Sequence, residues 1–239
     1  QEDEFALISL GAPSPLLRMA FPNDPPPYLE FLDKEDVDER DLRQWQRKMR
    51  EFVTMQMYRK RKPIVLKSPT HTGRVQILAD MFPRAKFIHI TRNPYELFSS
   101  TKRLWAALDE VQAFQLPHEH NLEEYVYTAL ERMYRGFERQ RSALPPGSIC
   151  DVRYEDLIQD PVGTMRQIYE QLQLGDFEAI RPRVERSMQQ RRGHKINRHD
   201  VPAQQRSEIE RRWGTYLTKY GYSAPTSASE AKSAATPTV

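Results

Sequence analysis

The chain has 239 residues, which is the size of one ordinary domain. Hydrophobic residues make up 38% of it and charged residues 29%, and the mean hydropathy is −0.76; this balance excludes a membrane-embedded protein and a disordered polymer. The 36 Lys and Arg residues nearly balance the 33 Asp and Glu residues, so the net charge is +3 and an anion site must come from local clustering. The single cysteine, Cys150, excludes an intramolecular disulfide and a zinc site built from cysteines.

The sequence carries no sign of a membrane span or an export signal. No apolar run approaches the roughly 20 residues that cross a bilayer, and the start, Gln1 to Glu4, lacks the basic-then-apolar layout of a signal peptide. We therefore expect no membrane span and a cytoplasmic location. Residues 223–239 are mostly Ser, Ala, Thr and Pro, which predicts a disordered tail after one domain over residues 1–222.

The N-terminal quarter of the chain predicts two helices and a loop. A short helix is expected near residues 4–10, and the rest of the proline-rich stretch 5–27 is expected to form a loop over the core. Apolar residues at spacings of three and four predict an amphipathic helix over residues 36–60.

From residue 64 onward, short apolar runs alternate with helical patterns. The apolar runs cover 64–66, 87–90 and 148–152, and the predicted helices cover 74–81, 94–108, 122–142 and 161–172. Continuous apolar runs between helices are typical of a buried parallel sheet with helices on its faces. The sequence therefore predicts an α/β protein with three layers, α/β/α, around a central parallel sheet.

The spacing of the glycines excludes the familiar phosphate loops. Walker and dinucleotide loops place two or three glycines in one short turn, whereas no two of the nine glycines here lie within six residues of each other. Neither G-x-G-x-x-G nor G-x-x-x-x-G-K-[ST] occurs.

Anion-binding and aromatic residues follow each of the three predicted strands. Ligands of parallel sheets bind at the carboxyl ends of the strands. Lys67 and His71 follow the first run, Arg92 follows the second just before a helix, and Tyr154 follows the third. An arginine fork at a helix N-terminus suits a phosphate, and Ser100, two turns along that helix, adds a hydroxyl. Together these residues predict a site for a nucleotide phosphate.

Each residue taken singly also has a structural interpretation. Arg92 can form a surface salt bridge, Tyr154 can be a rim aromatic, and a lone histidine such as His71 is more often a hydrogen-bonded structural residue than a catalyst. The coincidence at three strand ends favours the functional interpretation.

Three segments resemble the sulfotransferases that use 3′-phosphoadenosine 5′-phosphosulfate: residues 66–72, 82–94 and 154–161, in matching order and spacing. The resemblance extends over roughly residues 1–222. It implies a fold like that of the P-loop nucleoside triphosphate hydrolases, and transfer of a sulfuryl group to a hydroxyl or amine acceptor. It also implies that Arg92 and Ser100 hold the 3′-phosphate and that Tyr154 lies near the adenine. Arg192 and Gly193 match more loosely a segment that reaches the nucleotide phosphate in this family.

The opening residues resemble a segment of the bacterial branch that follows the loop for the 5′-phosphosulfate. That loop, of Pro-Lys/Arg-Ser-Gly-Thr-Thr type, does not occur in the sequence. The resemblance therefore predicts a domain truncated at its N-terminus, and it leaves a rival open: a sulfotransferase-like domain that binds a nucleotide or a partner without turnover.

Sulfuryl transfer requires compensation of charge on the leaving phosphate and a base for the acceptor. By position, Lys67 can stabilise the charge that develops on the bridging oxygen. His71 is one candidate base, and the acids Glu2, Asp3 and Glu4 are others; an acidic helix start is the structural alternative for these acids. We predict no metal.

The stretch 181–199 carries seven Lys and Arg residues against one acid, Glu185. A solvated helix face commonly explains such a run, and nucleic-acid binding is an alternative. Because aromatic residues are not interleaved, a groove for single-stranded nucleic acid is disfavoured. In the family that the sequence resembles, this region closes over the nucleotide, so the resemblance implies a lid here, together with a small-molecule or glycan acceptor and no nucleic-acid partner.

Overall fold

The computed structural model describes residues 2–118, 122–190 and 201–222. Two strands, β1 (Phe87–Thr91) and β2 (Ile149–Arg153), pair in parallel, with Phe87 opposite Ile149 and Thr91 opposite Arg153. Both were predicted as apolar runs, and both are confirmed as parallel strands. No helix in the described part of the chain has the length and apolar character needed to cross a membrane.

The prediction of a strand at residues 64–66 is wrong. This segment lies between helices without forming a ladder with β1 or β2, and Val65 is 91% exposed. An apolar run becomes a strand only when a neighbouring strand completes its hydrogen bonds. Within the described ranges no strand does so for this run.

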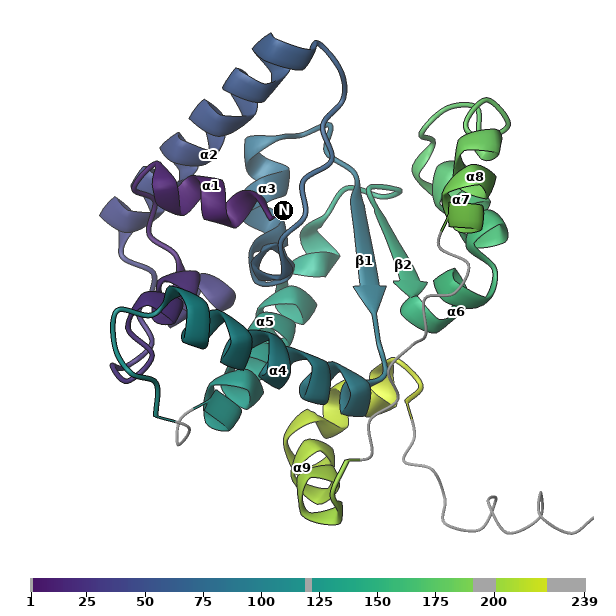
Figure 1. Ribbon diagram of the computed structural model, residues 1–239. Helices are drawn as coiled ribbons and strands as arrows, with labels where there is room; N and C mark the ends of the chain where they lie inside the picture. Colours follow the sequence, from purple (N-terminus) through teal and green to yellow (C-terminus); the bar gives the residue numbers. More distant parts are fainter. Residues whose placement is uncertain (1, 119–121, 191–200, 223–239) are drawn as a thin grey trace, which may run out of the picture.

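Helices pack against both faces of the strand pair, as the sequence predicted, although on one face they cover β2 and leave β1 partly exposed. On one face His89 packs against Phe137 of α5 (Leu122–Gln140), with the ring centroids 4.2 Å apart, and against Tyr220, which follows α9 (Ala203–Lys219). On the other face, Cys150 and Val152 of β2 share a buried cluster with Ile168 and Leu172 of α7 (Pro161–Leu172). Helices, strands and helices thus form three layers (Figure 1).

The N-terminal helices enclose a second buried hydrophobic cluster beside the sheet. The predicted helices near 4–10, 36–60 and 74–81 are confirmed as α1 (Asp3–Ser9), α2 (Glu39–Lys60) and α3 (Val75–Met81). One buried cluster joins them, and its fully or nearly fully buried members include Leu7, Trp45, Met49 and Ile77. Figure 1 shows α1 and α2 at the upper left, away from α6, α7 and α8, which lie beside β2 at the right.

The remaining helices lie between and after these elements in the chain. Helix α4 (Pro94–Gln112) follows β1 and extends beyond the predicted end at residue 108. Helices α6 (Tyr154–Gln159) and α8 (Arg181–Gln190) were not predicted as separate elements. Four short 3₁₀ helices complete the described chain: η1 (Pro15–Ala20), η2 (Leu29–Leu32), η3 (Pro69–Arg74) and η5 (Arg141–Ala143). The first of them lies inside the stretch 5–27 that was expected to be loop.

One edge and part of one face of β1 are open. Ile88 and Ile90 point away from the face that α5 and α9 cover, and they are 44% and 48% exposed. In the described part of the chain β2 is the only strand that pairs with β1. The molecule therefore exposes apolar side chains on the same strand that leads into the candidate site.

Candidate functional site

Arg92 is the single residue between the end of β1 and the N-cap of α4. The side chain of Asn93 caps the helix by accepting from the backbone N–H groups of Tyr95, at 3.0 Å, and Glu96, at 3.5 Å. Pro94 occupies the first turn, where its missing N–H is harmless and its fixed φ favours the helix. The local sequence therefore ends the strand, starts the helix and leaves Arg92 at the turn between them.

The guanidinium of Arg92 lies over the ring of Tyr154, 4.6 Å from its centroid. Tyr154 begins α6 directly after β2. The two neighbouring parallel strands therefore bring Arg92 and Tyr154 together at their carboxyl ends, as the sequence predicted. The Arg92 side chain is a quarter exposed, and its contact with Glu96 is long, at 3.5 Å. Its Nε is buried and has no hydrogen-bond partner among the described residues. The guanidinium therefore keeps donor capacity for an anion.

Ser100 lies on the same face of α4 as this contact. Glu96 and Ser100 are four residues apart, which places them one above the other along the helix. Ser100 is half-buried, whereas the hydroxyl of the adjacent Ser99 donates to the Tyr95 carbonyl within the helix. The structure thus brings Arg92 and Tyr154 together at one end of the sheet and places Ser100 on the face of α4 that begins there; their roles toward a nucleotide remain predictions.

Side chains that sequence reasoning missed hold the backbone of this turn. The Tyr216 hydroxyl contacts the backbone of Arg92, and a carboxylate oxygen of Glu155 accepts from the N–H of Asn93 at 2.8 Å. Glu155 belongs to the Tyr-Glu-Asp segment, so its neighbourhood was signalled. Tyr216 lies 124 residues from Arg92, and no local pattern marks it.

Lys67 and His71 form a second group with the acidic start of α1. The Lys67 ammonium pairs with Glu2 at 2.8 Å, and its side chain is 70% exposed. His71, in η3, places Nε2 2.7 Å from Oδ2 of Asp3. Among residues 2–118, 122–190 and 201–222, no hydrogen bond or ion pair joins this group to Arg92, Ser100 or Tyr154.

The His71–Asp3 contact fixes the proton on one ring nitrogen. Burial by itself raises the pKa of Asp3, but the hydrogen bond and charge of His71, with Arg74 nearby, outweigh it and hold that pKa below its usual value. An ionised carboxylate can only accept, so in neutral His71 the proton lies on Nε2 and the lone pair on Nδ1. Nδ1 is buried and has no hydrogen-bond partner in the described structure. His71 therefore has the tautomer of a general base.

Glu4, also predicted as a candidate base, has a structural position. Its side chain is fully buried, one oxygen accepts from Ser14 at 2.7 Å, and the other pairs with Arg74 at 2.5 Å. Burial raises the pKa of Glu4, but the charge and hydrogen bond of Arg74 more than compensate and lower it. A carboxylate that is buried and already paired cannot reach an acceptor proton, so we assign Glu4 to the fold rather than to the chemistry.

Two further predictions concern the segment after α8. Arg192 and Gly193 lie outside the described residues, as does the second half of the basic stretch predicted to form a lid, residues 191–199. Helix α8, which begins that stretch, pairs Arg181 with Glu178 and Glu185. No cluster of three or more metal-ligating side chains occurs in the part of the chain that the structure describes.

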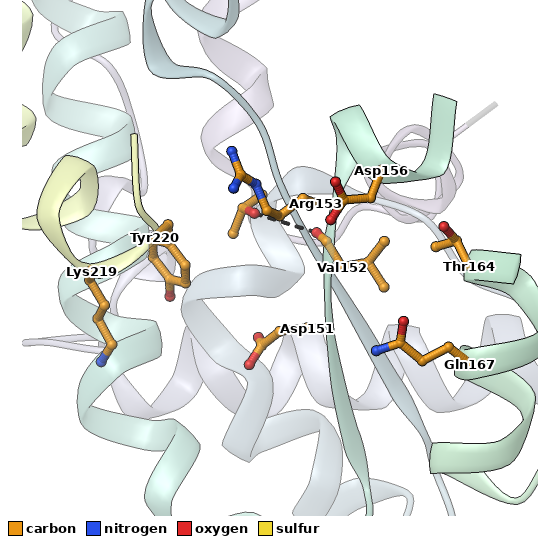
Figure 2. A pocket seen from close by; sticks show the side chains of 9 residues that line it. Asp151, Val152, Arg153, Asp156, Thr164, Gln167, Lys219 and Tyr220 are labelled. Atoms are coloured by element: carbon orange, nitrogen blue, oxygen red, sulfur yellow. Dashed lines mark hydrogen bonds between the residues drawn. The ribbon is translucent and has the colours of Figure 1, made fainter. Parts of the chain in front are cut away.

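A cavity of about 280 Å³ opens beside β2, and none of the predicted site residues lines it. Figure 2 shows Thr164 and Gln167 of α7 on one side of the strand and Lys219 and Tyr220 on the other. Its one lysine is already paired and two acids line it: Lys219 pairs with Glu138, Asp156 and Asp151 face the cavity, and hydrogen bonds from His89 and Arg141 lower the pKa of Asp151 to about 2. This cavity therefore suits a phosphate less well than the Arg92 turn does.

Comparison with known proteins points in the same direction as the sequence motifs. The model of a family described as the sulfotransferase family matches residues 15–178. Two proteins named omega-hydroxy-beta-dihydromenaquinone-9 sulfotransferase Stf3, from Mycobacterium bovis and Mycobacterium tuberculosis, are each 40% identical to the chain over 222 residues, covering 93% of this chain and 57% of theirs.

A solved structure supports the fold. The crystal structure of sulfotransferase STF9 from Mycobacterium avium matches with a TM-score of 0.65 and 16% identity, over 77% of this chain and 48% of that one. At this identity the likeness confirms the predicted fold class and nothing finer. The chain spans about half the length of the relatives it matches.

Proposed function

The chain belongs to the sulfotransferase family, and we propose that it carries the 3′-phosphate site of a sulfotransferase that uses 3′-phosphoadenosine 5′-phosphosulfate. The bound donor supplies the sulfuryl group. Arg92 and Ser100 hold its 3′-phosphate, and Tyr154 lies against its adenine. One observation carries the proposal: the Arg92 guanidinium is loosely paired, has an unpartnered buried Nε, and is placed over an aromatic ring at a helix N-terminus.

We assign the acceptor proton to His71. Nδ1 of His71 is buried in this structure, so the proposal requires that the bound acceptor gains access to it. Nδ1 then takes the proton of the acceptor hydroxyl as the oxygen–sulfur bond forms, and the bond between sulfur and the 5′-phosphate oxygen breaks. Asp3 stabilises the imidazolium through Nε2, as a carboxylate does for a catalytic histidine elsewhere. Lys67, whose side chain is largely exposed, offsets the charge on the leaving phosphate.

We propose a small lipid-like acceptor with a hydroxyl group. The support is the activity in the names of the relatives at 40% identity, which are omega-hydroxy-beta-dihydromenaquinone-9 sulfotransferases. A cytoplasmic location and the absence of a nucleic-acid partner stay predictions.

The loop for the 5′-phosphosulfate is proposed to lie outside these 239 residues, because no Ser-Gly-Thr-Thr occurs in them. The same absence favours a second candidate function, a domain that binds the nucleotide without turnover. A sulfate-transfer assay separates the two: with the bound donor present, the full-length protein transfers sulfate under the first proposal and none under the second.

Ligand selectivity tests the proposed site. Arg92→Ala weakens binding of 3′,5′-adenosine bisphosphate by more than about tenfold, because a charge-assisted contact contributes about 1.5–3 kcal/mol. It changes binding of 5′-AMP, which lacks the 3′-phosphate, by less than about twofold. Arg206→Ala is the matched control, since Arg206 also lies over a tyrosine ring, 4.9 Å from the centroid of Tyr95. Calorimetry that finds equal losses for both ligands with Arg92→Ala contradicts the assignment.

A further inference from the structure

The backbone of Arg92 depends on one side chain for both of its hydrogen bonds. The N–H of Arg92 donates to the Tyr216 hydroxyl at 3.0 Å, and that hydroxyl donates to the Arg92 carbonyl at 2.9 Å. Arg92 follows the last residue of β1 and precedes the N-cap of α4, so neither the ladder nor the helix provides these partners. A hydroxyl has one hydrogen and two lone pairs, so it can satisfy both groups at once.

The Tyr216 hydroxyl is itself held in place. Tyr216 is buried on α9, and its ring packs edge-on against Tyr134, at 4.5 Å between centroids. The Tyr220 ring is tilted by 50° against the Tyr216 ring at 4.9 Å, and the Tyr216 ring also stacks parallel to Tyr222 at 6.0 Å. Burial raises the pKa of Tyr216, so the hydroxyl keeps its proton at neutral pH and can donate to the carbonyl. Three aromatic neighbours therefore fix where the hydroxyl points.

The next peptide group has a parallel support. One carboxylate oxygen of Glu155 accepts from the N–H of Asn93 at 2.8 Å, and the other accepts from the Tyr222 hydroxyl at 2.7 Å. The two peptide units that carry Arg92 and Asn93 are thus held by residues from α6, α9 and the chain just after α9. These contacts set the direction in which the Arg92 side chain leaves the backbone.

We propose that Tyr216 is a positioning residue for the 3′-phosphate, which acts by holding the backbone of Arg92, with Glu155 and Tyr222 as a weaker second support. The inference rests on the proposed function of Arg92. Without the hydroxyl, the N–H and carbonyl of Arg92 lose their partner and the peptide turns to find others. The guanidinium then leaves its place over Tyr154. Tyr216 touches no ligand in this account.

The test is ligand selectivity in the full-length protein. Tyr216→Phe removes one oxygen and keeps the aromatic packing. We expect its affinity for 3′,5′-adenosine bisphosphate to fall about tenfold, the range for a backbone group left unsatisfied, while its affinity for 5′-AMP changes less than about twofold. Tyr220→Phe is the matched control. It also removes a partly buried tyrosine hydroxyl from the same aromatic cluster, but this hydroxyl donates to Glu138 and does not contact Arg92. It leaves both affinities within about twofold.

The outcomes separate this inference from the function it rests on. A Tyr216→Phe variant that melts like the wild type and loses neither ligand, or both equally, overturns the positioning role. An Arg92→Ala variant without selectivity overturns the proposed function instead. If Tyr216→Phe does not fold, Tyr222→Phe tests the second support. It gives a selective loss of about twofold to fivefold if backbone positioning matters, and an equal effect on both ligands overturns the proposal.

Discussion

Breaking the ion pair between Arg74 and Glu4 is expected to destabilise the fold strongly. Their side chains are 1% and 0% exposed, Nη2 of Arg74 lies 2.5 Å from Oε2 of Glu4, and the guanidinium lies over Trp45, 4.4 Å from the ring centroid. Arg74→Met keeps apolar contact with Trp45 but leaves the Glu4 charge buried without a cation. Removing one partner of such a pair costs about 3–5 kcal/mol, a large part of the roughly 5–15 kcal/mol that stabilises a typical domain.

A double-mutant cycle separates the pair from the effect on packing. In Glu4→Gln/Arg74→Met neither charge remains, so the double variant should regain about 2 kcal/mol or more relative to the sum of the single losses. Urea denaturation followed by circular dichroism gives all four free energies of unfolding. Arg43→Met is the surface control: Arg43 pairs with Glu39, but these side chains are 67% and 84% exposed, so the cost should be below about 1 kcal/mol. A cost below about 1 kcal/mol for Arg74→Met itself would refute the reasoning.

Three further predictions follow from the described contacts. Arg74 lowers the pKa of Glu4 below its usual 4.5, so the stabilisation is complete above pH 4.5 and is lost as the pH falls through the lower, folded-state pKa; acid titration of Glu4→Gln should show a flatter loss. Asp3→Asn should lower the rate of sulfate transfer about 10²–10⁴-fold with little change in donor affinity, and an unchanged rate constant rules out the His71–Asp3 base. The 239-residue chain by itself should self-associate through the open side of β1, and Ile88→Lys with Ile90→Lys should reduce this; light scattering that finds a monomer before substitution contradicts it.

The sequence predicts those parts of the fold that depend on local pattern. The apolar runs at 87–90 and 148–152 become β1 and β2, and the spacings of three and four become α2, α4, α5 and α7 within a few residues. The run at 64–66, Ile-Val-Leu, is the most apolar of the three, but it forms no ladder with β1 or β2. Strand formation needs a neighbour from elsewhere in the chain, and that neighbour cannot be read from three apolar residues.

The candidate site is likewise only partly predictable from the sequence. The strand-end rule places Arg92 near Tyr154 before any coordinates are known, because both follow strands that point the same way. The rule does not say whether an acidic residue at the start of a helix faces solvent or the interior. Asp3 and Glu4 are adjacent in sequence, yet one pairs with His71 and the other with the buried Arg74. Only the packing of α1 against η3 separates a candidate catalytic group from a structural one.

The support of the Arg92 turn is the least predictable feature of the site. A strand followed by a capped helix leaves the residue between them without backbone partners, so the sequence Thr91-Arg92-Asn93-Pro94 already requires some group to supply two hydrogen bonds. It cannot say which group, because the partner is a hydroxyl 124 residues away on a helix whose pattern is otherwise ordinary. The unpaired backbone groups of Arg92 follow from the local sequence, whereas the hydroxyl that pairs with them comes from a distant part of the chain. The proposed binding residue is therefore visible in a motif, whereas the residue proposed to position it becomes visible only in the folded chain.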